Sequence, residues 1–239
     1  CIRDYLTNTY YGLGEASANL NDTSFEDAAD ICDEAVSLGN GGVHARYACD
    51  GALDTGSQIK SNIEALLASM GGRLGYSGGQ YFLQAAAYIT PTINIDESVM
   101  VGELQVQTKQ TRRGVYNGVK GVFLSEEENY TLCDYPAQIS STYATEDGDP
   151  IYLDMPLPFV TNNIRAQRLA KIALLKSRQQ VSVTVPLNLA GLKLKAGDFI
   201  TISNDRLGWT NKAFEVLDYT LSAGTDGQLS VNVSCVETA

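Results

Sequence analysis

Few residues of this sequence have the type and spacing that catalysis requires. His44 is the one histidine among 239 residues, so any Ser–His–Asp or Cys–His arrangement depends on it alone. Glu126, Glu127 and Glu128 are adjacent carboxylates that could serve as the acid and base of glycan hydrolysis. His44 lies at the start of an expected strand, and the glutamates lie in an expected acidic loop. We therefore interpret both features as structural and predict no catalytic residue.

The candidates for metal and cofactor sites are equally weak. Asp147-Gly148-Asp149 resembles part of a calcium-binding loop, but the spaced ligands and the distal glutamate of such a loop are missing. The five cysteines form no C-x-x-C pair and have no nearby histidine, which argues against zinc. A chain of this apolar content can fold without disulfides, so we expect reduced thiols. These are Cys1, Cys32, Cys49, Cys133 and Cys235. We predict no metal and no cofactor.

The charge of the chain disfavours nucleic acid as a partner. A net charge of −11 and a pI near 4.5 repel a phosphate backbone. Basic residues do gather at Lys109, Arg112, Arg113 and Lys120, where solvated surface and ion pairs explain them. No apolar run approaches the roughly 18 residues of a membrane span. We expect neither sequence-specific nucleic-acid binding nor membrane insertion, and a start at Cys1 without a leader pattern predicts an excised segment.

The first third of the chain predicts two amphipathic helices and a hairpin. A helix is expected over 22–38, with Asp22, Thr23 or Ser24 as its cap, and it ends at the glycines of 39–42. A strand over 43–49 and a second helix over 57–70 follow, and this helix places Leu66 on its apolar stripe. Two further strands meet at a Ser77-Gly78-Gly79 turn.

From residue 91 onward the period of the pattern changes to two, which predicts strands. The expected strands lie at 93–95, 104–108, 115–124, 181–203, 212–221 and 229–237. The stretch 125–160 is rich in Glu, Gly and Pro and predicts a long excursion with one short hairpin. Such a set of strands can close into a small barrel, which removes exposed sheet edges.

A third helix over 162–178 shows apolar residues on two sides. Ala166, Leu169, Ala170 and Ala173 form one stripe, whereas Ile172 and Leu175 lie among basic residues. Trp209 could anchor a partner, because aromatic residues concentrate at interface centres, although core packing explains it equally well. The predicted interface residues are Arg165, Arg168, Ile172, Leu175 and Trp209.

The fold class expected from these patterns is α+β and mainly β. A small α/β domain of helix, strand, helix and hairpin is followed by a β-barrel-like domain that carries one helix. The expected domains are an incoming segment 1–14, an α/β domain 15–90 and a β-barrel-like domain 91–239.

The order of several segments resembles that of a known family. RDYLTNTYYGLG, SFEDAADICDEAV and NIEALLASMGGRLGYSGGQYFLQAAAY, followed by LQVQTKQTRRGVYNGVKGVFLS, resemble the host-specificity, J-like tail-tip proteins of lambdoid phages and prophages. The resemblance covers nearly the whole chain and implies a structural hub role, without enzyme activity. It also implies homotrimers, neighbouring phage tail proteins as partners, assembly in the host cytoplasm and a final place at the virion tail tip.

Two alternative functions remain at this point. One is a tail-associated peptidoglycan hydrolase or esterase-like enzyme that uses the glutamates at 126–128. The other is a receptor- or glycan-binding module. The sparse acids and bases favour the structural hypothesis.

Overall fold

The computed structural model describes residues 1–38, 42–109, 111, 114–223 and 229–238. Within these residues the chain divides into two compact units, and each unit is built from two separate segments. Unit 1 contains 1–87 and 116–175, and unit 2 contains 88–115 and 176–239. Of the predicted features, the helix-ending residues 39–41 and the basic residues Arg112 and Arg113 lie outside the described residues.

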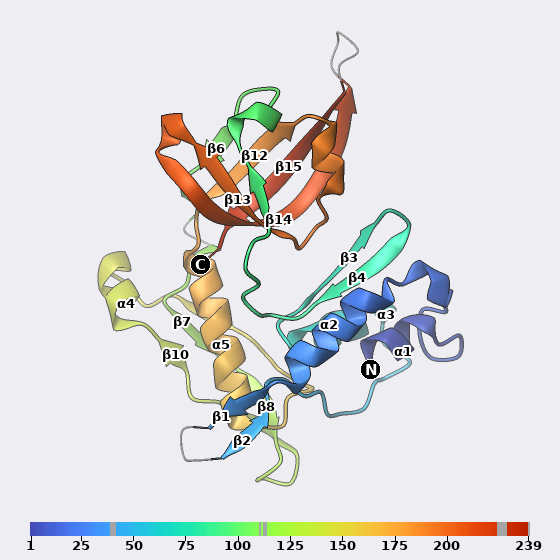
Figure 1. Cartoon of the computed structure of the whole chain (residues 1–239). Helices are drawn as coiled ribbons and strands as arrows, with labels where there is room; N and C mark the ends of the chain where they lie inside the picture. Colours follow the sequence, from blue (N-terminus) through green and yellow to red (C-terminus); the bar gives the residue numbers. More distant parts are fainter. Residues whose placement is uncertain (39–41, 110, 112–113, 224–228, 239) are drawn as a thin grey trace. The chain divides into compact units, whose positions relative to one another are not determined.

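Unit 1 combines helices with short strand pairs. Its helices, coloured from blue to gold in Figure 1, are α1 (Ile2–Thr7), α2 (Asp22–Asp33), α3 (Ile59–Ala68), α4 (Ser141–Asp147) and α5 (Asn163–Arg178), whose last residues from 176 belong to unit 2. Its strands are β1 (Ala35–Ser37), β2 (Val43–Ala45), β3 (Arg73–Ser77), β4 (Gln80–Gln84), β7 (Gly118–Lys120), β8 (Val122–Ser125), β9 (Thr131–Asp134), β10 (Gln138–Ile139) and β11 (Tyr152–Asp154). A 3-10 turn spans Ser17–Asn19.

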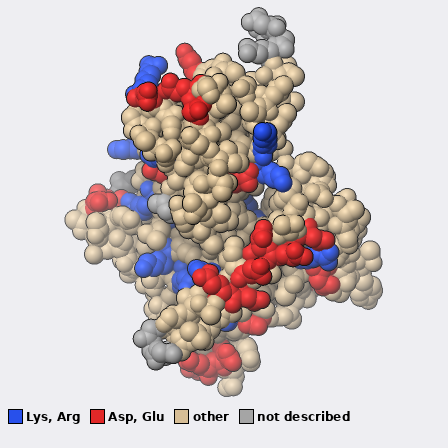
Figure 2. Space-filling view, viewed as in Figure 1, with Lys and Arg blue, Asp and Glu red and all other residues tan. Residues whose placement is uncertain are grey.

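Helix α2 begins as the sequence predicts but ends earlier. Its cap is Asn21, one residue before the predicted group, and the Asn21 side chain accepts a hydrogen bond from the Ser24 amide at 3.1 Å. The predicted end at Leu38 is wrong, because residues 35–37 form β1 and pair with β2. The acidic side of α2 remains exposed, and Figure 2 shows it as a band of Asp and Glu side chains.

The predicted second helix and hairpin are confirmed, with shorter bounds for the helix. Helix α3 buries Leu66, and the chain then turns at Gly71, whose φ of +56° favours glycine. Strands β3 and β4 pair in antiparallel register around Gly78 and Gly79, which have φ of +58° and +85°. Two successive positive φ angles are typical of a tight hairpin turn.

One buried side chain fixes residues 147–151 of the segment predicted as a long excursion. The Asn117 side chain is 1% exposed and donates to the Asp149 carbonyl at 2.7 Å and to Asp147 Oδ2 at 3.0 Å. Its oxygen accepts from the Ile151 amide at 2.7 Å. These bonds fix the turn after α4, so that β11 lies parallel to β7 in a three-stranded sheet with β10.

One apolar core joins both segments of unit 1. Helix α5 contributes Ala166, Leu169 and Ala170, which the sequence pattern predicts, and also Leu174. They pack with buried residues of the first segment such as Leu6 and with those of 116–160. Residues 1–14, predicted as an incoming segment, include α1, whose Ile2, Tyr5 and Leu6 belong to the same core.

Unit 2 is a six-stranded sheet in the order β5-β13-β14-β15-β12-β6. The strands are β5 (Ile93–Ile95), β6 (Gln105–Gln107), β12 (Ser182–Leu187), β13 (Phe199–Asn204), β14 (Trp209–Ala223) and β15 (Leu229–Glu237). All neighbours are antiparallel except β5 and β13. Alternate residues are buried, as the period of two predicts: Val183, Val185, Leu187, Ile200, Ile202, Val231, Val233 and Cys235.

The fold class is confirmed as mixed α and β with more strand than helix. The closed barrel that the strand pattern permits does not form, because the outer strands β5 and β6 do not pair with each other among the described residues. Both outer strands are only three residues long, and short edge strands limit unwanted pairing. Whether 15–90 and 91–239 are separate folding domains stays a prediction.

Among the described residues, no helix has both the length and the apolar character that crossing a membrane would require.

We predict that Leu66→Ala lowers the free energy of unfolding by about 2–5 kcal/mol, because it leaves a cavity in the unit 1 core. Leu132→Ala is the matched control, since Leu132 is 67% exposed and its truncation removes little buried area. Urea unfolding followed by circular dichroism measures both. Equal midpoints for the two variants would contradict the assignment of Leu66 to the core.

We predict that Asn117→Ala costs about 1–3 kcal/mol, because the Asp149 carbonyl and the Ile151 amide lose their partner. Hydrogen exchange should locate the effect. The substitution should raise the exchange rate of the Ile151 amide and leave the rates of the amides in the β3–β4 hairpin unchanged. Uniformly unchanged exchange would show that Asn117 does not order this segment.

Candidate functional site

The predicted catalytic candidates do not form a reacting centre. His44 lies in β2 opposite Val36, and neither ring nitrogen has a hydrogen-bond partner among the described residues, although both nitrogens are buried. A histidine that acts as a general base needs a hydrogen-bonded nucleophile or an orienting carboxylate. His44 has neither in this structure.

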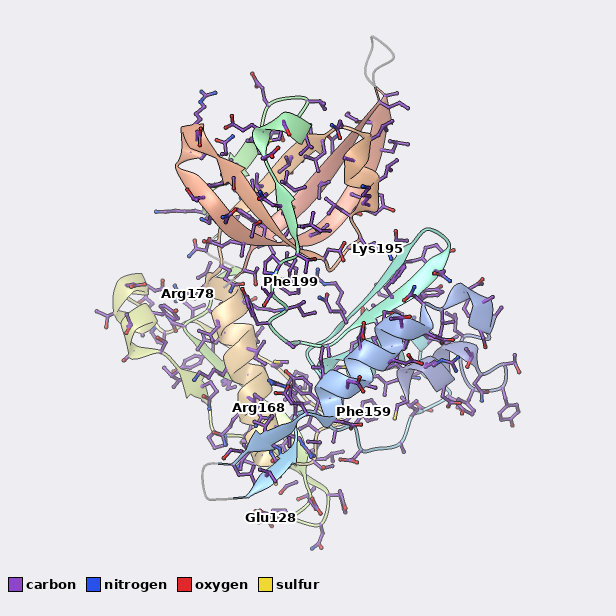
Figure 3. All side chains as sticks on the ribbon, viewed as in Figure 1. Glu128, Phe159, Arg168, Arg178, Lys195 and Phe199 are labelled. Atoms are coloured by element: carbon purple, nitrogen blue, oxygen red, sulfur yellow. The ribbon has the colours of Figure 1, made fainter. Side chains whose placement is uncertain are left out.

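The three glutamates lie in the exposed loop of the β8–β9 hairpin. Figure 3 labels Glu128 in this loop, and all three residues are exposed. Asn129 and Tyr130 follow with φ of 54° and 58°, and the Tyr130 ring is exposed. Glycosidases hold two carboxylates on opposite sides of a bound sugar. Three carboxylates side by side on a convex loop lack that arrangement.

The Asp147-Gly148-Asp149 sequence is the end of a helix. Gly148 terminates α4 with φ of +78°, and Asp147 accepts a hydrogen bond from Asn117. Among the described residues no group of three or more His, Cys, Asp or Glu side chains could hold a metal ion. The arrangement therefore resembles a capped turn more than a calcium loop.

Four of the five predicted interface residues lie on α5 in unit 1, and Arg165 and Arg168 face the β1–β2 hairpin. Arg165 Nε donates to the Ala45 carbonyl at 3.3 Å, and Arg168 Nη1 donates to the Arg46 carbonyl at 2.9 Å. Ile172 packs in part against the unit 1 core, whereas Leu175 is 45% exposed. The helix thus has a basic side next to β2 and an exposed apolar residue near its end.

Trp209, the fifth predicted interface residue, lies in unit 2 at the start of β14. It packs partly against the unit 2 core, with its ring centroid 5.3 Å from that of Phe214. Lys212 Nζ lies 5.2 Å from the centroid of the Trp209 ring. Core packing therefore accounts for much of the buried surface of this side chain, so Trp209 is the weakest of the interface candidates.

Two residues next to the α5 arginines were not selected from the sequence. Arg46 follows β2, and its Nε and Nη2 donate to Glu34 Oε2 at 2.9 Å and 2.6 Å. Glu34 is the residue after α2. Nothing in the local pattern indicates that Arg46 meets α5, because 122 residues separate it from Arg168.

A largely apolar cavity of about 580 Å³ lies within unit 1. Its wall is formed by parts of α1, α2, α3, β4 and residues 47–49, with Phe25, Leu66 and Met70 among the apolar side chains. Asp22, Glu26 and Asp33 also line it. This cavity was not predicted, since its wall combines residues from several elements.

The cysteines are free thiols, as expected. Burial raises the pKa of Cys32 and of Cys49, both of which line the cavity. Asp33 adds to the shift at Cys32, whereas a hydrogen bond with Ser69 opposes the shift at Cys49. Cys235 is 1% exposed in the unit 2 core, and burial raises its pKa to about 12. Reactive thiols have lowered pKa values, so these shifts argue for structural rather than nucleophilic cysteines.

The sequence is similar to that of a curated phage protein. It is 25% identical over 166 residues, which is 69% of this chain, to the baseplate hub protein pb3 of Escherichia phage T5. The match spans 17% of the length of that protein. No protein-family model matches the chain.

The fold is similar to those of solved proteins from phage tails and related particles. A chain from the virion of the native gene transfer agent particle has a TM-score of 0.60 and 16% identity, with 89% of this chain and 45% of that chain covered. The tail protein from Neisseria meningitidis MC58 has a TM-score of 0.56 and 12% identity, with 90% of this chain and 66% of that chain covered. The 43 kDa tail protein of prophage MuSo2 from Shewanella oneidensis has a TM-score of 0.52 and 11% identity, with 78% of this chain and 56% of that chain covered. At these identities the likeness is one of fold.

We predict that Cys1 reacts first with a thiol reagent at pH 8 and that Cys235 reacts only when unit 2 opens, because one thiol is exposed and the other is buried. Folding raises the Cys235 pKa from an ordinary value near 9 to about 12, so the folded state holds this proton more tightly. The stabilisation is therefore complete below pH 9 and is lost as the pH rises toward 12. Cys235→Ala should flatten this loss in pH-dependent unfolding. Rapid labelling of Cys235 in the folded chain would contradict its burial.

Proposed function

We propose that this chain is a structural, non-enzymatic part of the tail-tip or baseplate hub of a bacteriophage or prophage. The sequence similarity to the T5 baseplate hub protein carries the proposal, because it extends over 69% of the chain. The likeness in fold to three solved proteins from tails and virion particles supports it. A closer relation to the J-like proteins of lambdoid phages is part of the proposal.

The scattered chemistry of unit 1 favours a structural role. His44, the glutamates at 126–128 and the α4 terminus lie on separate elements. Catalysis by acids and bases requires such groups to converge on one reacting atom. The two apolar cores instead account for most of the sequence pattern, which suits a rigid scaffold.

The proposed partners are identical copies, as a homotrimer in the full-length protein, and neighbouring tail proteins. A closed ring repeats each contact around its axis, so modest contact areas add up to a stable assembly. Arg165, Arg168, Ile172, Leu175 and Trp209 remain the proposed interface residues. The proposed location is the virion tail tip, after assembly in the host cytoplasm, with an indirect role in host attachment and DNA delivery.

We predict that Val233→Asp in the producing genome abolishes complete tails. Val233 is fully buried in the unit 2 sheet, and an unpaired carboxylate there prevents folding. Electron microscopy of induced particles should show filled heads without mature tail tips, and mass spectrometry should detect the unsubstituted chain in purified tails. Complete tails that lack this chain would overturn the hub role.

The matched control replaces the hairpin glutamates by glutamine at positions 126, 127 and 128. These side chains are exposed, so their replacement should leave the infectious titre and the release of fragments from cell-wall sacculi unchanged. Normal tails with impaired sacculus degradation would favour the peptidoglycan hydrolase. Binding of the purified chain to intact host cells would favour the receptor-binding module instead.

A further inference from the structure

Three guanidinium groups gather where α5 meets the β1–β2 hairpin. Arg165 and Arg168 donate to the backbone carbonyls of Ala45 and Arg46, at 3.3 Å and 2.9 Å. The Arg46 side chain extends from the same backbone segment toward Glu34. The two α5 side chains are thereby held beside Arg46, and we call Arg46, Arg165 and Arg168 the arginine cluster. Figure 3 labels Arg168 on α5.

The charge of the arginine cluster is not balanced within unit 1. Among the described residues, Glu34 is the carboxylate that forms an ion pair with the cluster, with Glu34 Oε2 at 2.6 Å from Arg46 Nη2. Burial lowers the pKa of Arg168, Tyr47 opposes this shift, and the positive charges of Arg46 and Arg165 add to it. A guanidinium has five N–H donors, and the recorded hydrogen bonds of Arg165 and of Arg168 use one each. The remaining N–H donors of these two side chains are therefore available to an acceptor beyond the described residues of this chain.

A complementary surface lies on α2. Glu26, Asp30 and Asp33 are exposed and follow one another at spacings of four and three residues, so they form one stripe on the helix. We call these three residues the acidic stripe. The helix contains no Lys or Arg between Asp22 and Asp33. Like charges at this spacing disfavour a helix. Arg3 pairs with Asp22 and also attracts Glu26, so the chain offsets this repulsion at the start of α2. Asp30 and Asp33 have no ion pair among the described residues.

We propose that the arginine cluster of one copy binds the acidic stripe of a second copy of this chain. Arg165 and Arg168 are three residues apart on α5, and Asp30 and Asp33 are three residues apart on α2, a rise of about 4.5 Å in both helices. Two guanidinium forks can therefore each meet one carboxylate, which is a strong, directional form of hydrogen bond. The exposed Leu175, further along α5, would lie toward the rim of this contact.

The local charge pattern, and not the overall charge, favours a second copy as the source of the carboxylates. Two chains that each carry a net charge of −11 repel each other in most orientations. The orientation that joins the arginine cluster to the acidic stripe is attractive, so the charge pattern selects it from the others. Because the two surfaces differ, the contact is heterologous and can continue around a ring. The inference thus rests on the proposed function, in which identical copies are neighbours.

Sedimentation velocity at low ionic strength tests this contact. The unsubstituted chain should self-associate, and added salt should weaken the association because the carboxylates of the acidic stripe are exposed. Asp30→Lys combined with Asp33→Lys should weaken it on the order of tenfold or more. The control is Glu126→Lys combined with Glu127→Lys, which changes the net charge equally on the β8–β9 hairpin and should leave the association at least as strong.

A charge exchange between two variants is the decisive measurement. Arg165→Glu combined with Arg168→Glu should lose self-association, and circular dichroism checks that this variant folds. An equimolar mixture with the α2 variant should restore association at a one-to-one ratio. The unsubstituted arginine cluster of the α2 variant then meets the unsubstituted acidic stripe of the α5 variant, and the two reversed surfaces also match. If the α5 variant does not fold, the α2 variant and its hairpin control still decide the outcome.

Several results would overturn the contact. These are an absence of salt-sensitive self-association, an α2 variant that associates like the parent, and a mixture that stays monomeric. If inorganic phosphate binds the arginine cluster while the chain does not self-associate, the cluster is a binding site for a free anion, which also overturns the proposal. If the chain is found in tails but forms no such contact, the contact is wrong and the hub function still holds. Failure of this inference is therefore distinguishable from failure of the proposed function.

Discussion

The fold depends on contacts between segments that are far apart in the sequence, because the chain alternates between its two units. Unit 1 needs residues 1–87 and residues 116–175, and the segment between them belongs to unit 2. The Asp50 amide donates to the Phe159 carbonyl at 3.0 Å, and Thr161 Oγ1 donates to Asp50 Oδ2 at 2.9 Å. These bonds close a loop of more than 100 residues. The entropy lost in closing such a loop grows only slowly with its length, so the shared apolar core can offset it.

The sequence predicts those elements whose structure is decided locally. The Ser77-Gly78-Gly79 turn is local, since positive φ at two glycines selects the hairpin without other contacts. The alternation in β12 and β15 is also local, because one face of each strand is buried. The end of α2 is not, since residues 35–37 leave the helix to pair with β2. The turn at 147–151 depends on Asn117, whose partners are about 30 residues away.

The candidate site divides in the same way. The basic side of α5 is visible in the sequence because Arg165 and Arg168 share one helix face. The position of Arg46 beside them is not visible, since it requires β2 to pack next to α5. The apolar cavity has the same origin, because no single element provides its wall. Local patterns thus show which side chains a helix offers, and only the tertiary contacts show which of them meet.

Charge separation between α2 and α5 is the feature that intramolecular stability explains least. α5 contains five basic residues and no acidic one, whereas α2 contains five acidic residues and no basic one. Mixed charges on each helix would stabilise the isolated chain better, because opposite charges one turn apart attract. A chain whose recognition depends on orientation gains from the separation, since each helix then attracts only a surface of opposite charge. The segregated surface charge therefore supports the proposed role in assembly.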